Sequence, residues 1–384
     1  MTTETTEPKV HRGLIGVHFD RSSTCFIDGQ AGELRYRGYS IHDLAAHSSF
    51  EEAAYLLLRG ELPTRHELAA FDAELKVARS LPAPIVDIIG MVKDGHPMDV
   101  LRTAVSALAV FDPEVADTSP EATVRKGVRL VSQMPMIVAA HHRIREGREP
   151  VSPDGALGHA ANFLYMLKGE VPGVGVATLM DTDMVLHAEH GSNASTFTAR
   201  VVTGTEANLH AAVTAAVAAL SGPAHGGAAE NVMKMVKEVG SAERAAEYVN
   251  AKRAAREPVM GFGHRVYRTE DPRARHLREG VRKLSVEMGQ PHWYEILEAV
   301  VTAMAPYARH GIHVNVDFYA GVMYHLCGIP EDLFVPIFAV GRVPGWTAQA
   351  LEQLENNILI RPLLLYEGPG PRSYVPIDQR GADA

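Results

Sequence analysis

The chain has 384 residues, which is enough for a large buried core and predicts two or three domains. Its formal net charge of −9 excludes a global positive field that would attract nucleic acid or an anionic membrane. An anionic substrate must therefore bind at a local cluster of cations. The two cysteines are too few for a disulfide framework, and no apolar run reaches the ~20 residues of a membrane helix. We expect a cytoplasmic protein with no membrane or nucleic-acid partner.

The first segments of the chain predict a flexible end and a small hairpin. Residues 1–11 are rich in Thr and Glu and have no apolar core of the kind found in secretory signals. We therefore expect that this segment is disordered and is not a targeting signal. Further on, the runs Cys25-Phe26-Ile27 and Leu34-Arg35-Tyr36 flank a turn at Asp28-Gly29-Gln30, which is typical of a β-hairpin.

Helical signals dominate the rest of the chain. Ser48 with Glu51, and Thr64 with Glu67, fit the capping box that opens a helix. Because strands and helices do not alternate, a doubly wound sheet is excluded, and the sequence predicts an all-α protein with a minor N-terminal hairpin. Further helices are predicted from the apolar periodicity over residues 97–108, 174–190 and 207–220.

A change of composition at Ser221-Gly222-Pro223 predicts the domain organisation. Residues 222–327 are more charged and divide into shorter helical stretches, and apolar helical character returns over 333–351. We expect a large helical domain over 1–221 that resumes over 328–384. A smaller helical domain over 222–327 would be inserted in it through Gly/Pro hinges.

Five segments place His, Asp or Arg beside Gly or Pro, where a side chain can be held outside a helix interior. In the first segment, His187 and His190 lie three residues apart in a predicted helix, so a metal site must be considered. However, no third ligand follows at a recognised spacing, and the pattern is not the HExxH signature. A helix end with hydrogen-bonded imidazoles explains the same pattern.

The second segment, Gly222-Pro223-Ala224-His225-Gly226-Gly227, places His225 at a predicted helix start. The field of the helix N-terminus would lower its pKa and keep the imidazole neutral, as a hydrogen-bond donor for an enolate oxygen needs to be. On its own the pattern also fits a turn histidine without a function.

The third segment runs from Gly261 through His264 and Arg268 to Asp271-Pro272-Arg273. Asp271 is a candidate N-cap with Pro272 at the first helical position, so Arg273 would lie in the first turn. An Arg beside free amide N–H groups can bind a carboxylate or a phosphate. For either arginine alone, a solvated helix start is the simpler interpretation.

The last two segments add a carboxylate and two more arginines. Asp317 heads a predicted helix that ends near Cys327, and it is either a plain N-cap or a general base that the helix field keeps ionised. Arg342 and Arg361 lie among apolar residues at predicted helix breaks, where a guanidinium needs an anionic partner.

Taken together, the five segments resemble the citrate synthase family. The motifs HAEHGSNASTFTAR, GPAHGG, MGFGHRVYRTEDPRA, VNVDFYAGV and FAVGRVPGW occur in the family's order and approximate spacing. The resemblance covers nearly the whole chain from about Gly13. It implies an acyltransferase that condenses acetyl-CoA with oxaloacetate and hydrolyses the product to citrate and CoA, a step of the tricarboxylic acid cycle.

The resemblance also implies the site residues. His225, His264 and Asp317 match the family's catalytic set, and Arg268 matches a position near the CoA phosphate. The resemblance implies an all-α homodimer that closes over its substrates, with no metal and no cofactor, since the CoA thioester is a substrate. The positions that match oxaloacetate or citrate contacts are His190, Asn193, Arg273, Arg342 and Arg361, the last reaching in from the partner subunit.

Three alternatives stay open at this point. A methylcitrate synthase that uses propionyl-CoA would carry the same motifs, because one methyl group in a pocket changes selectivity by only about 1–3 kcal/mol. A metal-dependent hydrolase could be built on His187, His190 and Asp317. A non-catalytic acyl-CoA-binding protein could retain the fold.

Overall fold

The structure is a computed structural model that describes residues 9–381. The chain divides into two units, one of them Ser22–Leu359 and the other the terminal segments Met1–Arg21 with Ile360–Ala384. Disorder is predicted for residues 1–11, and residues 1–8 of that segment lie outside the described range. The terminal unit contains the short 3₁₀ helices η1 (Arg12–Leu14) and η6 (Ile377–Gln379).

The prediction of an all-α protein is confirmed, with sixteen α-helices between residues 9 and 381. Within that range, no helix is both long enough and apolar enough to span a bilayer. The helices are α1 (Ile41–His47), α2 (Phe50–Arg59), α3 (Arg65–Val77), α4 (Ala83–Met91), α5 (Pro97–Leu108), α6 (Pro120–Arg145), α7 (His159–Lys168), α8 (Val174–His187), α9 (Ala194–Gly204), α10 (Leu209–Leu220), α11 (Ala228–Val239), α12 (Ala245–Ala254), α13 (Ala274–Glu287), α14 (His292–Met304), α15 (Asp317–Leu326) and α16 (Phe334–Glu355).

The predicted hairpin is confirmed and carries one more strand. Strands β1 (Cys25–Asp28), β2 (Glu33–Tyr36) and β3 (Tyr39–Ser40) form an antiparallel sheet in that order. Tyr36 is fully buried, and its hydroxyl donates to the carbonyls of Val185 and Leu186 at 3.2 and 3.1 Å. The small sheet is therefore anchored to the end of α8.

One of the two predicted capping boxes is confirmed, and the other is wrong by one residue. Thr64 and Glu67 cap α3 reciprocally, as expected. At α2 the N-cap is Ser49, whose hydroxyl accepts from the amide of Glu52, while Ser48 ends α1. The reason is tertiary, because the Glu51 carboxylate accepts the amide N–H of His159 at 2.7 Å and so serves the start of α7.

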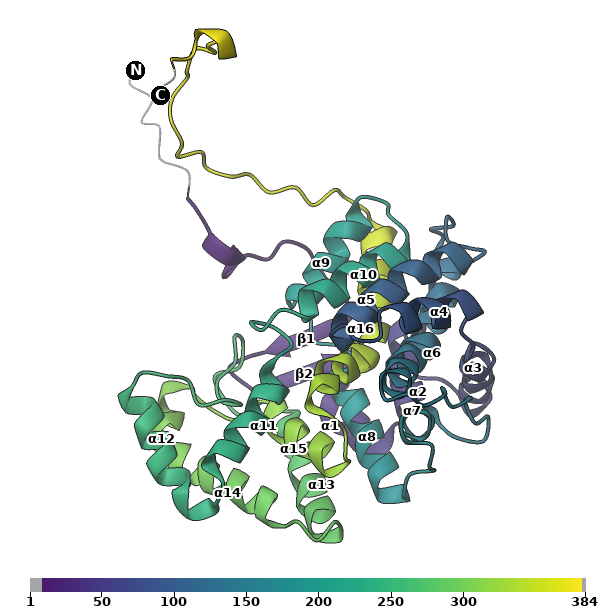
Figure 1. Ribbon diagram of the computed structural model, residues 1–384, viewed down its shortest axis with the longest axis vertical. Helices are drawn as coiled ribbons and strands as arrows, with labels where there is room; N and C mark the ends of the chain where they lie inside the picture. The colour runs from purple at the N-terminus through teal and green to yellow at the C-terminus, as the bar shows by residue number, and fades with distance from the viewer. Residues whose placement is uncertain (1–8, 382–384) are drawn as a thin grey trace. The chain divides into compact units, whose positions relative to one another are not determined.

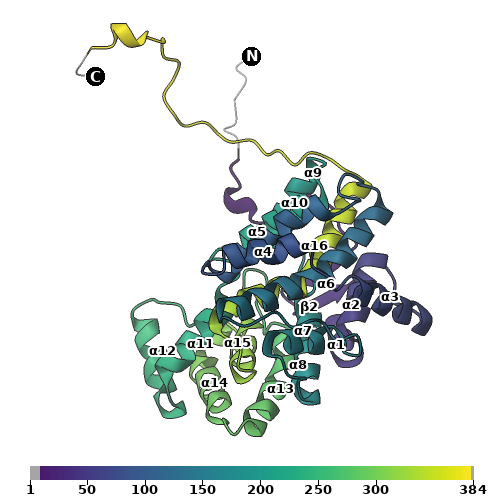
Figure 2. The same ribbon diagram turned by 45° about the vertical axis from the view of Figure 1, so that its right-hand side comes forward.

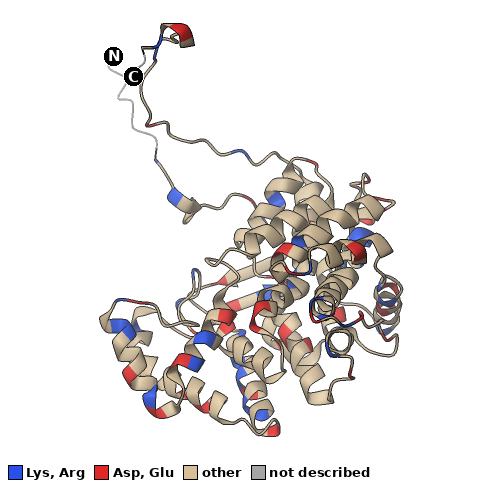
Figure 3. Cartoon of the chain, viewed as in Figure 1, with Lys and Arg blue, Asp and Glu red and all other residues tan. Residues whose placement is uncertain are grey.

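Helix α16 forms the centre of the core. It packs against α2, α6, α8, α9 and α10, and nearly all of its side chains are buried. A helix that is buried on every side needs few charges, and the charged residues of α16 are limited to Arg342, Glu352 and Glu355. Charged side chains of both signs lie instead on helices such as α12 and α13 (Figure 3).

Helices α11 to α15 lie together in both ribbon views (Figures 1 and 2). Helices α11 and α13 pack against α15, and α12 packs against α14. Helix α13 also packs against α8, where Gly280 leaves the space that Leu179 fills. The 222–327 limits of a smaller domain stay a prediction.

Candidate active site

Three aromatic side chains from two loops form the centre of the candidate site. His190 follows the end of α8, and His264 and Tyr267 lie in the loop before α13. His190 Nε2 is 3.1 Å from the Tyr267 hydroxyl, and the His190 and His264 rings are 5.2 Å apart between centroids. Burial, followed by the nearby Arg273, holds the pKa of His190 well below its ordinary value. His190 is therefore a neutral imidazole at physiological pH.

Backbone donors fix the tautomer of His264. The amides of Val266 and Tyr267 both point at its Nδ1, at 3.0 and 3.1 Å. An amide N–H can only donate, so Nδ1 is the acceptor and the proton of the neutral ring lies on Nε2. Burial and the positive Arg273 lower the pKa of His264 to about 4. The ring is thus a neutral N–H donor at neutral pH.

His225 is fixed in the same way but with the opposite nitrogen. The amide N–H of Ser195, in the first turn of α9, donates to His225 Nε2 at 3.2 Å, which leaves the ring proton on Nδ1. Burial and Arg342 lower the pKa of His225 to about 4. The lowered pKa agrees with the neutral His225 imidazole that the sequence predicts, but the predicted cause is wrong. His225 does not start a helix, because α11 begins at Ala228, and the helix N-terminus that His225 contacts is that of α9.

Arg273 is buried and lies beside an acid of its own segment, Asp271. Its guanidinium donates to both oxygens of Asp271, at 3.0 and 2.7 Å. The predicted helix start is two residues too early, because Asp271 caps a turn through the amide of Arg273 and α13 begins at Ala274. Arg273 therefore lies immediately before the helix and not in its first turn.

Arg342 lies inside an unbroken helix, so the predicted helix break at this position is wrong. Gly341 and Gly345 lie on one face of α16, and a Cβ on Gly345 would be 2.2 Å from the carbonyl of Ala188. These glycines bring α16 against the 187–189 backbone, where Arg342 Nε donates to the carbonyl of His187. The Arg342 guanidinium also lies 4.6 Å from the Phe338 ring centroid.

The charge around Arg342 is only partly balanced. Glu189 is buried and has its pKa raised to about 7 by desolvation, although Arg342 opposes the rise. Burial lowers the pKa of Arg342 to about 10, and the positive Arg273 contributes to the same direction. A buried guanidinium whose protonation is opposed by burial and by a second cation favours the binding of an anion.

Asp317 is the first residue of α15 and not its N-cap, which is Val316. Its pKa is raised by burial, while His187 and Arg273 act in the opposite direction, so the predicted stabilisation of the carboxylate by the helix start is not the dominant effect. Within residues 9–381, no donor is hydrogen-bonded to its carboxylate. The group is thus available to accept a proton.

Other predicted residues have structural partners or lie elsewhere. The Asn193 side chain caps α9 by accepting the amide of Thr196 at 3.1 Å. The ring of His187 is bound to Asp183, and between residues 9 and 381 no three His, Cys, Asp or Glu side chains are placed to hold a metal ion. Arg268 is exposed. Arg361 belongs to the terminal unit.

Sequence reasoning missed the residues that orient the imidazoles. Ser195 holds His225 through its amide and its hydroxyl, and its hydroxyl accepts from the Trp346 indole at 3.2 Å. Tyr267 contacts both His190 and His264. Both residues stand inside the motifs quoted above, but neither residue type identifies a backbone donor.

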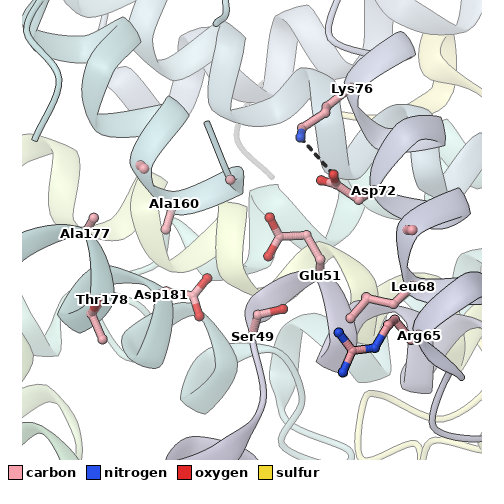
Figure 4. A pocket seen from close by; sticks show the side chains of 13 residues that line it. Ser49, Glu51, Arg65, Leu68, Asp72, Lys76, Ala160, Ala177, Thr178 and Asp181 are labelled. Atoms are coloured by element: carbon pink, nitrogen blue, oxygen red, sulfur yellow. Dashed lines mark ion pairs between the residues drawn. The ribbon is translucent and has the colours of Figure 1, made fainter. Parts of the chain in front are cut away.

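A pocket of about 570 Å³ lies elsewhere, between α2, α3, α7 and α8 (Figure 4), and contains none of the candidate residues. The buried Glu51 and the half-buried Asp181 in it have structural roles. Glu51 accepts the first amide of α7, and Asp181 accepts the first amide of α2, from Phe50, at 3.2 Å. At the rim, Lys76 pairs with Asp72. The pocket therefore offers no unused catalytic group comparable to those of the candidate site.

The chain is similar to known proteins over nearly its whole length. The family model described as citrate synthase, C-terminal domain, matches residues 13–363. Citrate synthase 2 of Bacillus subtilis is 45% identical over 374 residues, 96% of this chain and 99% of that protein. A 2-methylcitrate synthase of Mycobacterium tuberculosis is 42% identical over 371 residues, 96% of this chain and 93% of that protein.

A solved structure is also similar to this fold. The citrate synthase of Thermoplasma acidophilum, solved as a ternary complex with carboxymethyl coenzyme A and oxaloacetate, superposes with a TM-score of 0.91. It is 30% identical in sequence, and the match covers 97% of this chain and 100% of that one.

Proposed function

Since this chain belongs to the citrate synthase family and is an enzyme of the acyltransferase class, we propose that it condenses acetyl-CoA with oxaloacetate. The product thioester is then hydrolysed to citrate and CoA. One observation carries the proposal: the neutral imidazoles of His225 and His264, each with its proton fixed on one nitrogen by backbone amides, lie in the same site as Arg273 and Arg342.

The first step makes a nucleophile from the acetyl group. Asp317 removes a proton from the methyl carbon, and its raised pKa makes it a stronger base than an exposed carboxylate. The Nδ1–H of His225 donates a hydrogen bond to the thioester oxygen, where negative charge develops. A neutral donor suits this role because it stabilises the enolate without protonating it outright.

The second step joins the enolate carbon to the ketone carbon of oxaloacetate. The Nε2–H of His264 polarises the ketone oxygen, which gains one proton to become the hydroxyl of the product and so balances the proton that Asp317 removed. Arg273, Arg342 and His190 bind the two carboxylates of oxaloacetate. Asn193, in the same segment as His190, contributes to the same binding site. Water then cleaves the thioester and releases CoA, and we place Arg268, which is exposed, near the CoA phosphate.

Propionyl-CoA is the competing acyl donor. The M. tuberculosis relative named a 2-methylcitrate synthase is 42% identical, close to the 45% of the B. subtilis citrate synthase. We expect kcat/KM to be higher for acetyl-CoA than for propionyl-CoA, measured by thiol release with saturating oxaloacetate. A higher value for propionyl-CoA would reassign the enzyme as a methylcitrate synthase, and no thiol release from either would refute catalysis.

We also propose a cytoplasmic homodimer in which Arg361 completes the site of the partner subunit. Arg361→Leu and Asp317→Asn chains should each be inactive alone. In an exchanged mixture half the dimers are mixed, and each mixed dimer has one intact site, so about a quarter of wild-type activity should return. Mass spectrometry of differently labelled chains measures the exchange. Mixed dimers without recovered activity would show that Arg361 does not act across the interface.

A further inference from the structure

The tip of the β1–β2 hairpin, residues 28–32, lies against the loop that carries His264, residues 264–271. The amide of Arg268 in this loop donates to the carbonyl of Gly29 in the tip at 2.8 Å. The contact leaves no room for side chains. A Cβ on Gly29 would be 2.2 Å from the Val266 carbonyl oxygen, and a Cβ on Gly32 would be 2.7 Å from the Thr269 hydroxyl oxygen.

The hairpin tip is a rigid element. The Asp28 carboxylate accepts the amides of Gln30 and Ala31 at 2.8 and 2.9 Å, which closes the turn. Asp28 and Glu33 are opposite one another in the backbone register of β1 and β2. The sheet is anchored to α8 through the buried Tyr36. The 264–271 loop has no helix or strand of its own, so its position depends on the segments that it packs against, the tip among them.

A single peptide group connects the tip to the catalytic imidazole. The Val266 carbonyl faces Gly29, and the Tyr267 amide on the same peptide bond donates to His264 Nδ1. Because the peptide unit is planar, a shift of its oxygen tilts its N–H. The position of the hairpin tip therefore sets the direction in which the His264 ring is held.

We infer that the hairpin tip is a positioning element for His264: by close contact through Gly29 and Gly32 it holds the Val266–Tyr267 peptide so that the Nε2–H of His264 is aimed at the ketone of oxaloacetate. The inference rests on the proposed function, since it assigns the aim of a group whose role is proposed there. Gly29 and Gly32 touch no substrate in this scheme and act only through the loop.

The direct test is Gly29→Ala. The added methyl must displace the Val266 carbonyl, and misplacement of a catalytic group by about 1 Å can cost on the order of 10²-fold in rate. We expect kcat to fall about 10- to 100-fold, with a smaller change in oxaloacetate affinity. The infrared ketone band of bound oxaloacetate should move back toward its position in free solution. Gly90→Ala is the matched control, because a Cβ there meets nothing within 4 Å.

A double-mutant cycle keeps the inference testable if Gly29→Ala does not fold. Gly32→Ala should also lower kcat, partly through backbone strain, since φ at Gly32 is +69°. Thr269→Ala removes the atom that the new methyl meets, so the double variant should regain part of the lost kcat and of the band shift. Strain at Gly32 is common to both variants and cancels in the cycle.

The outcomes separate this inference from the proposed function. If the wild-type enzyme shows no shift of the ketone band, His264 does not polarise the carbonyl and the proposed function loses that role. If the wild type shows the shift and a folded Gly29→Ala keeps both the shift and wild-type kcat, the positioning role of the tip is refuted. An additive Gly32/Thr269 cycle would refute it as well.

Discussion

Two regions of the molecule bury carboxyl groups, and they use them differently. In the pocket between α2, α3, α7 and α8, Asp181 has its pKa raised to about 7 by burial, with Glu51 adding to the rise. In the candidate active site, burial raises the pKa of Asp317. The oxygens of Asp181 accept the Phe50 amide, whereas the Asp317 carboxylate has no hydrogen-bonded donor within residues 9–381.

The comparison shows that a raised pKa reports burial and does not by itself report function. Catalysis needs a group whose reacting atom is left unpaired while the rest of the side chain is held in place. His225 and His264 meet this condition, since backbone amides occupy one ring nitrogen of each. Glu51 does not meet it, because its carboxylate accepts a hydrogen bond from the first amide of α7.

The largest effect is expected from the active-site residues themselves. Asp317→Asn and His264→Ala should each lower kcat by about 10²–10⁴-fold, because proton abstraction and carbonyl polarisation act in the transition state. Steady-state thiol release measures the loss, and circular dichroism and sedimentation check that the fold and assembly are kept. Near-normal turnover by either variant would contradict its role and weaken the contrast with the pocket.

The sequence predicted the helical fold and hairpin because apolar periodicity and turn residues are local signals. It misplaced one capping box, since Ser48 with Glu51 and Ser49 with Glu52 fit the same pattern. Only the contact of Glu51 with the α7 amide decides between them. Such a contact joins residues 108 positions apart in the chain and leaves no local trace.

The candidate site was predictable as a set of side chains and not as an arrangement. The ordered motifs identified the histidines, the arginines and Asp317. They did not show that Gly341 and Gly345 let an unbroken helix approach the 187–189 backbone, because the same residues with Pro344 favour a helix break. Nor did they show that the Ser195 amide fixes His225, since every residue type except proline has an amide N–H.

The smallest effect on activity is expected in the pocket, and there the prediction concerns stability. Asp181→Asn keeps an oxygen that can accept the Phe50 amide and removes the buried charge. A carboxyl whose pKa is raised on folding, here to about 7, binds protons more tightly in the folded state. Its contribution to stability is full below the unfolded pKa and is lost as the pH rises through 7.

Wild type should therefore lose stability between pH 5 and pH 8 that Asp181→Asn does not lose. The difference in unfolding free energy, variant minus wild type, should increase by about 1–3 kcal/mol over this range. Urea unfolding at fixed protein concentration measures it, and kcat should stay within about twofold of wild type. Asp72→Asn, at the rim of the same pocket, removes the ion pair with Lys76 and serves as the control.

Two outcomes would contradict this prediction. If the difference in unfolding free energy does not change with pH, burial does not raise the pKa of Asp181. If turnover is lost instead, the pocket takes part in catalysis, and the contrast between the two regions does not hold.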